Sequence, residues 1–92
     1  MQPYFRLQIT TPQGHEYSGD VVHARIPVPG GSVGILANHA PYITAAAGGV
    51  CEVREKDGTE KSFNVGGGFF TVSHNQAVLL TQTFQAAQPQ TV

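Results

Sequence analysis

Charged side chains are scarce in this sequence of 92 residues. Asp, Glu, Lys and Arg make up 12% of the chain, whereas a typical globular domain has about 25%. Five basic and six acidic residues give a net charge of -1, so the chain has no cationic surface for a nucleic acid or an anionic lipid. We therefore expect no nucleic-acid partner. The length fits one small domain and excludes most two-domain enzymes.

The chain also has little cysteine and no long apolar run. Its single cysteine, Cys51, excludes an internal disulfide and any CxxC zinc or redox site. The apolar, strand-like surroundings of Cys51 predict an inert core thiol. No window reaches about 18 apolar residues, and the first residues lack the apolar stretch of a signal peptide. The sequence thus predicts no membrane span and a cytoplasmic location.

The histidines lack the close spacing of a metal site. None of them stands two or four residues from another, and they are His15, His23, His39 and His74. The glycine triplet at residues 66–68 lacks the Lys-Ser/Thr of a phosphate-binding loop, and predicts a tight bend instead. We therefore expect no metal and no cofactor. His39 lies within a charge-free segment, and it is the histidine that we expect in a contact with another molecule.

The few charges are concentrated in one part of the chain. Seven of the 11 charged residues lie between Glu52 and Lys61, and residues 26–51 and 62–92 contain none. A free soluble domain usually spreads charge over its surface. The distribution indicates that other faces of the domain are covered by neighbouring molecules. The alternative is a neutral, Gly/Thr/Gln/Asn-rich surface without a partner.

Short alternating patterns predict an all-β fold. Apolar and polar residues alternate at residues 5–10, and the Asp57-Gly58 pair between two alternating runs predicts a β-hairpin. Further strands are expected at residues 21–28, 42–44, 69–72 and 77–84, with turns at 11–14, 48–49 and 66–68. No window keeps an apolar period of 3.6 residues. The expected architecture is a small antiparallel β-sandwich of two sheets, or a barrel, spanning residues 1–85.

One segment matches the nucleophile elbow of serine hydrolases. Gly30 to Gly34 reads G-x-S-x-G around Ser32, and Asp57 and His74 follow in hydrolase order. The helix after Ser32, the parallel sheet and the chain length that this elbow needs are all missing. We favour a flexible or contact-making loop, and expect no enzymatic activity. A small serine hydrolase acting through Ser32 is the enzyme alternative.

The same segment carries a family resemblance. Residues 31–41 read G-x-x-G-I-x-x-x-H-A-P, and this pattern resembles the amino-terminal domain of the epsilon subunit of bacterial rotary ATP synthases. The agreement extends to Ser18-Gly19, Gly49, Gly67-Gly68 with Val72, and the strand containing Val78-Leu79-Leu80. It covers about residues 4–85, nearly the whole chain.

The resemblance implies a non-catalytic rotor subunit at the foot of the central stalk. Such a subunit binds the gamma subunit along one face of a β-sandwich and the polar loops of the c-ring at one end. It couples proton flow to ATP synthesis, and lies peripherally on the cytoplasmic face of the cell inner membrane. The alternative from another class is a free-standing β-sandwich adaptor that binds an unrelated protein.

Site residues follow from the same resemblance. The loop that reaches the c-ring corresponds to Gly31, Ser32 and Val33. The gamma contact corresponds to His39, Pro41 and Thr44, with Thr11 as a weaker candidate.

The chain departs from the family pattern at its carboxyl end. Family members commonly add a helical hairpin that inhibits ATP hydrolysis, and this sequence stops about where that hairpin would begin. Residues 86–92 are polar and broken by Pro89, so we expect a flexible tail there. Both a naturally short form, which the Met1 start and the Gln/Pro ending fit, and a truncated one agree with this sequence. Inhibition and ATP binding through the hairpin are not implied for it.

Overall fold

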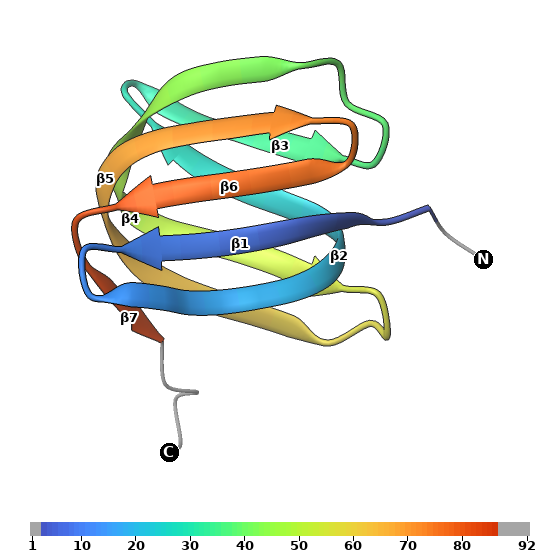
Figure 1. Ribbon diagram of the computed structural model, residues 1–92, viewed down its shortest axis with the longest axis horizontal. Helices are drawn as coiled ribbons and strands as arrows, with labels where there is room; N and C mark the ends of the chain where they lie inside the picture. Colours follow the sequence, from blue (N-terminus) through green and yellow to red (C-terminus); the bar gives the residue numbers. More distant parts are fainter. Residues whose placement is uncertain (1–2, 87–92) are drawn as a thin grey trace.

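The computed structural model describes residues 3–86, and every regular element in that range is a β-strand (Figure 1). The strands are β1 (Phe5–Thr11), β2 (Gly14–Val28), β3 (Gly31–Leu36), β4 (Tyr42–Glu55), β5 (Glu60–Ser73), β6 (Gln76–Thr81) and β7 (Phe84–Ala86). The prediction of an all-β fold is confirmed.

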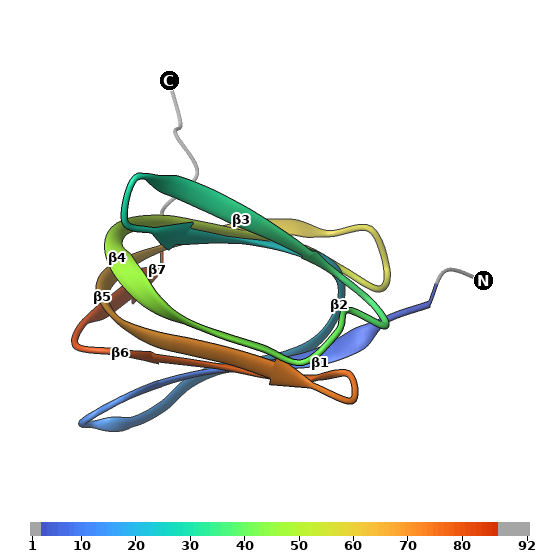
Figure 2. The same ribbon diagram turned by 90° about the horizontal axis from the view of Figure 1, so that it is seen from above.

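The strands form one continuous sheet that folds into two layers (Figure 2). The first layer contains β3, residues 21–28 of β2, residues 50–55 of β4, residues 60–65 of β5, and β7. The second layer contains residues 42–48 of β4, residues 68–73 of β5, β6, β1 and residues 14–21 of β2. Because β2, β4 and β5 belong to both layers, the two expected sheets are joined. The β1–β6 pair is parallel, whereas only antiparallel pairs were expected.

Glycines let β4 and β5 bend from one layer into the other. The two strands stay paired across the bend, with Gly48 opposite Gly66 and Ala46 opposite Gly68. Gly67 has a φ of +93°, which residues with a Cβ rarely adopt. A Cβ on Gly68 would overlap the carbonyl oxygen of Leu80. The expected turns at 48–49 and 66–68 are therefore bends within continuous strands.

Strand β2 begins earlier than expected and changes layer through a bulge. Its polar first half pairs with β1, so the strand starts at Gly14 rather than Val21. Val21 lies opposite Phe5 of β1 on one side and Glu55 of β4 on the other, and the register with β4 shifts before His23. Val21 and Val22 are both buried, as expected where an extra residue interrupts the alternation.

The last expected strand divides into two. The first part, β6, ends at Thr81. Beyond it, the N–H of Gln82 donates to the carbonyl of Gly67 (3.0 Å), and the N–H of Gly66 donates to the carbonyl of Thr83 (3.1 Å). The chain then forms β7 against β5. Ala86, which was expected to start the tail, pairs with Phe63 in this strand. The rest of the expected tail, residues 87–92, lies outside the described residues.

Two expected local features are confirmed. The Asp57-Gly58 hairpin joins β4 to β5, and the N–H of Thr59 donates to Asp57 Oδ1 (2.9 Å). This hydrogen bond holds the pKa of the Asp57 carboxyl below its usual range. Cys51 is fully buried, and burial raises the pKa of its thiol to about 12. The thiol therefore stays protonated at neutral pH.

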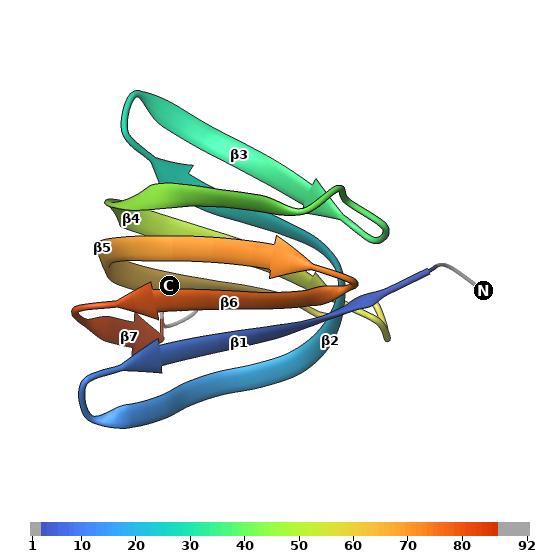
Figure 3. The same ribbon diagram turned by 45° about the horizontal axis from the view of Figure 1, so that its top comes forward.

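The core lies between the layers, and aromatic side chains cover it on the side where β7 lies. β3 and β7 lie toward opposite sides of the molecule (Figure 3). On the β7 side, Tyr17 packs on Phe63 (ring centroids 4.8 Å apart), and Phe63 packs on Phe84 (5.0 Å). The Tyr17 hydroxyl donates to Glu55 Oε2 (2.6 Å), and burial together with this bond raises the pKa of Tyr17. The fully buried large side chains are Phe5, Leu7, Ile9, Val21, Ile26, Ile35, Cys51, Phe70, Val72 and Leu79.

The glycine bend gives a test of the fold. Gly68→Ala should lower the free energy of unfolding by at least about 2 kcal/mol, because the new Cβ meets backbone atoms that cannot move aside. The matched control is Gly31→Ala, whose Cβ would meet nothing within 4 Å; it should stay within about 0.5 kcal/mol of wild type. Urea denaturation measures both. Equal stability of the two variants would contradict the role of Gly68.

Candidate protein-binding surface

The outer surface of the second layer is apolar and uncharged over β4, β5 and β6, whereas Arg6 of β1 and Asp20 of β2 form an exposed ion pair at its edge (3.2 Å). Ile43, Phe69 and Leu80 are 73%, 61% and 50% exposed. Phe69 lies between Ala45 and Leu80 in the pairing of β4, β5 and β6. We define the neutral face as the outward residues of two rows across these strands and β1: Gln8, Thr10, Ile43, Ala45, Phe69, Thr71, Val78 and Leu80. Contiguous exposed apolar surface of this kind is typical of protein interfaces.

An apolar hollow lies at one end of the neutral face. Its volume is about 290 Å³, and its lining residues are Thr10, Thr11, Pro12, Gly68, Phe69, Leu80, Thr81 and Gln82. Thr11 itself is 7% exposed, so it contributes to the wall of the hollow more than to the surface. Its hydroxyl accepts the N–H of Gln13 (3.2 Å) and lies 2.9 Å from Glu16 Oε2, to which it donates.

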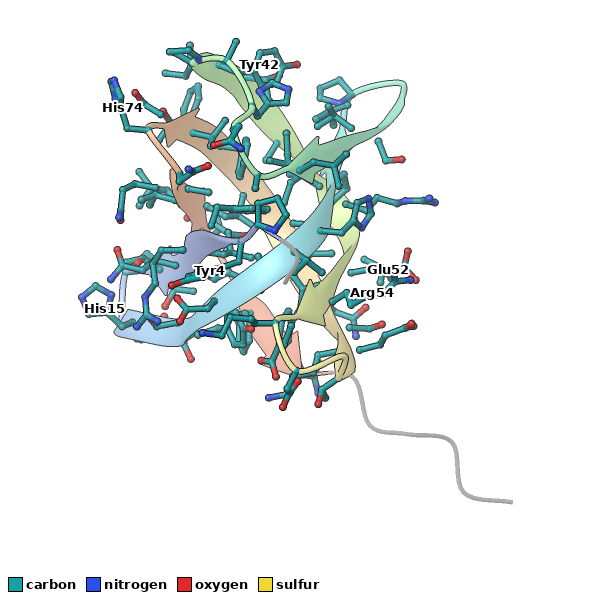
Figure 4. The ribbon with its side chains drawn as sticks, turned by 90° about the vertical axis from the view of Figure 1, so that its right-hand side faces the viewer. Tyr4, His15, Tyr42, Glu52, Arg54 and His74 are labelled. Carbon is teal, nitrogen blue, oxygen red and sulfur yellow. The ribbon has the colours of Figure 1, made fainter. Side chains whose placement is uncertain are left out.

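The outer surface of the first layer carries most of the other charges. Its ion pairs are Arg25–Glu52 (3.9 Å) and Arg54–Glu60 (3.4 Å), whereas Lys61–Glu55 (3.2 Å) lies at the edge of the layer beside Tyr17. Figure 4 shows Glu52 and Arg54 projecting from the side opposite His15 and His74. Exposed pairs of this kind contribute about 0–1 kcal/mol each, so their main effect is to keep this surface hydrated. The uneven charge along the sequence is therefore also uneven in space.

The loop between β3 and β4 holds two of the predicted gamma contacts. Pro41 is exposed and His39 is half-buried. His39 Nδ1 lies 2.7 Å from the carbonyl oxygen of Ala40, and the imidazole lies 5.7 Å from the Tyr42 ring. His39 and Pro41 line a second hollow together with His74 and neighbouring residues of the β5–β6 turn. The loop thus leads directly into the neutral face at the start of β4.

Thr44 faces inward, unlike its neighbours. It is half-buried and pairs with the buried Phe70, and its hydroxyl donates to the carbonyl of Ala45 (3.1 Å). Ile43 and Ala45 present their side chains outward instead. Ile43, Phe69 and Leu80 were missed in the sequence analysis. The alternation of side chains along a strand would nevertheless have placed Ile43 and Thr44 on opposite faces of the sheet.

The predicted c-ring residues form a strand rather than a loop. Gly31, Ser32 and Val33 are the first residues of β3. The turn before them is Pro29-Gly30, in which Gly30 has a φ of +86°, the conformation that a Pro-Gly type II turn requires. This dipeptide was not used in the sequence analysis, although a Pro-Gly pair is a signal that could have indicated the turn. β3 then runs from these residues toward the loop that holds His39, so the two predicted sites lie at opposite ends of the strand.

The hydrolase alternative lacks a triad. His74 Nδ1 lies 2.8 Å from Ser73 Oγ, and the Asp57 carboxylate accepts the N–H of Thr59. Ser32 lies in β3, six residues before Asn38, which contacts the turn that holds His74. At about 3.3 Å per residue along an extended chain, the serine and the histidine are far beyond hydrogen-bonding distance. The described residues therefore form no Ser-His-Asp arrangement.

Residues 3–86 also lack the features of a metal site and of a membrane-spanning helix. Within that range no three His, Cys, Asp or Glu side chains are grouped so that they could hold a metal ion. The same range has no helix of the length and apolar character that a bilayer crossing requires.

Comparison with protein families decides the assignment. The model of the family "ATP synthase, Delta/Epsilon chain, beta-sandwich domain" matches residues 4–87. The chain belongs to this family. The epsilon-type resemblance in residues 31–41 is thereby confirmed over nearly the whole length, and with it a non-catalytic subunit of the ATP synthase central stalk.

Individual relatives agree. The ATP synthase epsilon chain of Chlorobium limicola is 41% identical over 78 residues, which cover 85% of this chain and 89% of that one. The epsilon chain of Chlorobaculum tepidum is 38% identical with the same coverage. The mitochondrial ATP synthase subunit delta of Saccharomyces cerevisiae is 36% identical, and the match covers 83% of this chain and 48% of that one.

Solved structures share the fold. A chain in the Euglena gracilis mitochondrial ATP synthase complex of OSCP, F1 and c-ring has a TM-score of 0.80 at 23% identity, covering 87% of this chain and 51% of that one. A chain in the Tetrahymena thermophila mitochondrial ATP synthase central stalk and c-ring has a TM-score of 0.72 at 15% identity, with 87% and 64% covered. The fold is thus retained at low sequence identity.

Two adjacent phenylalanines test whether the neutral face serves the fold. Phe70 is fully buried, so Phe70→Ala should cost about 3–5 kcal/mol of unfolding free energy. Phe69 is 61% exposed, and Phe69→Ala should cost less than about 1 kcal/mol. Chemical denaturation of the isolated chain measures both. A loss at Phe69 as large as that at Phe70 would mean that the neutral face is part of the core.

Proposed function

We propose that this chain links the gamma subunit to the c-ring in the rotor of a proton-translocating ATP synthase, and so couples proton flow to ATP synthesis. It acts without a catalytic site of its own, on the cytoplasmic face of the cell inner membrane. The observation that carries the proposal is the neutral face, which gives a delta/epsilon-type domain a large apolar surface to bury. Its structural neighbours come from an ATP synthase complex of OSCP, F1 and c-ring and from one of the central stalk and c-ring.

The gamma subunit is the proposed partner of the neutral face. The molecule measures 34 × 31 × 27 Å, so one face has room for an interface of about 800 Å² per partner. His39 and Pro41 border this face at one end, and Thr11 lines the hollow at the other. Thr44 supports the strand from inside. Three of the four predicted gamma residues thus lie around one surface, and Ile43, Phe69 and Leu80 supply its exposed apolar area.

The c-ring is the proposed partner of the Pro29-Gly30 turn and of Gly31, Ser32 and Val33. Gly31 and Ser32 are exposed and Val33 is half-buried, and the segment carries no charge. Small exposed residues at the tip of a hairpin allow the backbone of another molecule to approach closely. This tip lies at the end of β3 remote from His39, so one rigid strand separates the two contacts.

A charge placed on the neutral face tests the proposal. Leu80→Asp buries an unpaired carboxylate under gamma, and should weaken the affinity of the chain for gamma about 100-fold, or about 2.7 kcal/mol. The matched control is Val50→Asp, because Val50 is 49% exposed against 50% for Leu80 but lies outside the neutral face. Titration calorimetry with purified gamma measures both, after circular dichroism has confirmed folding.

Three results would count against the proposal. A wild-type chain that fails to bind gamma at micromolar concentration would favour a free-standing adaptor. Equal weakening by both substitutions would indicate a general effect of charge. Unchanged binding of Leu80→Asp would place the gamma contact on another surface.

A further inference from the structure

Two asparagines join loops that are distant in the sequence. The backbone N–H of Asn38, between β3 and β4, donates to Asn75 Oδ1 (2.7 Å). Asn75, between β5 and β6, donates through Nδ2 to Asn38 Oδ1 (3.1 Å). The carbonyl of Asn75 also accepts the N–H of Arg6 at the start of β1 (2.9 Å). One residue therefore connects the end of β3 to β1, and we call the Asn38–Asn75 bonds the asparagine clasp.

The geometry of the clasp requires a side-chain amide at position 75 and a side-chain acceptor oxygen at position 38. Because a backbone N–H only donates, the Asn75 atom that receives it is the amide oxygen. The Asn75 amide nitrogen then faces Asn38 and needs an acceptor there. Asn38 and Asn75 have φ values of 66° and 60°, in the left-handed region that asparagine tolerates better than most residues. Backbone and side-chain preferences thus agree at both positions.

The clasp controls the loop that holds His39. Asn38 directly precedes His39, and the hollow beside the clasp is lined by His39, Pro41 and His74. The β3–β4 loop joins the two layers at a side of the molecule where the edge strands do not pair with each other. In residues 3–86, β3 pairs with β2 alone, and residues 42–48 of β4 pair with β5 alone. Within the described residues, these hydrogen bonds are what tie the loop to the second layer.

We propose that Asn75 is a positioning residue for gamma binding, which presets the β3–β4 loop in the conformation that docks. The inference rests on the proposed function. A loop that is already ordered loses less conformational entropy when it binds, so affinity rises without any contact between Asn75 and gamma. Because the bonds are at the surface, where water competes for them, their effect on global stability is small by comparison.

Glycine substitutions test the clasp, because glycine keeps the left-handed backbone accessible. Asn75→Gly removes both clasp bonds and should weaken gamma affinity about tenfold. Asn38→Gly keeps the backbone N–H that donates to Asn75 and loses the other clasp bond. Its affinity for gamma should therefore lie between those of the wild type and Asn75→Gly. The double variant should match Asn75→Gly. The control is His74→Gly in the same turn, also left-handed (φ 53°), which should stay within twofold of wild type.

Hydrogen exchange supplies a readout that does not depend on gamma. The amide of residue 38 should exchange at least tenfold faster in the Asn75→Gly chain, with its urea midpoint unchanged. Wild-type gamma affinity in Asn75→Gly would overturn the positioning role and leave the proposed function intact. Additive losses in the double variant, or an equal loss in His74→Gly, would also overturn it. Failure of the wild-type chain to bind gamma would instead overturn the proposed function.

Discussion

The close approach of two backbones at Gly68 sets the shape of this domain. β4 and β5 pass together from one layer to the other, and at the bend Gly68 lies against the carbonyl of Leu80 with no space for a side chain. This constraint is steric: glycine fits in the space at position 68, and a larger residue there would displace the strand. Because both strands bend at the same level, they remain paired and their hydrogen bonds are retained. The position of the neutral face follows from this bend, since the residues on its two sides lie in different layers, and residues 42–45 of β4 and 69–71 of β5 lie on the same side of it.

The separation of charge between the two surfaces follows from the same arrangement. The charged residues of β4 follow the bend, and those of β5 precede it. Both groups therefore lie in the first layer, where neighbouring strands supply opposite charges. Residues 42–48 and 68–73 lie in the second layer and carry no charge. A single pair of long strands therefore presents a hydrated surface at one end and an apolar surface at the other. This combination suits a small subunit that must be held by a larger one.

Local patterns predicted the local structure, and the long-range pairing escaped them. The Asp57-Gly58 turn, the alternation in β1 and the buried Cys51 depend on neighbours in sequence, and all three are confirmed. Gly48, Gly49 and residues 66–68 look like turns in isolation, and only pairing between them turns them into a bend. Phe69 and Phe70 illustrate the limit for the site: either could face the core until the pairing with Leu80 and Leu79 is known. The asparagine clasp had no sequence signal, because its members stand 37 positions apart.

The parallel contact between β1 and β6 has a consequence for synthesis of the chain. Residues 5–11 leave the ribosome shortly before β2 and can pair with it at once, whereas their parallel partner β6 begins only at Gln76. Until then, β1 has one unpaired edge and the apolar side chains of both layers stay accessible to water. The chain loses conformational entropy when the long loop between β1 and β6 closes, before the contacts between the two strands can offset that loss. Most of this domain must therefore have left the ribosome before the sandwich closes.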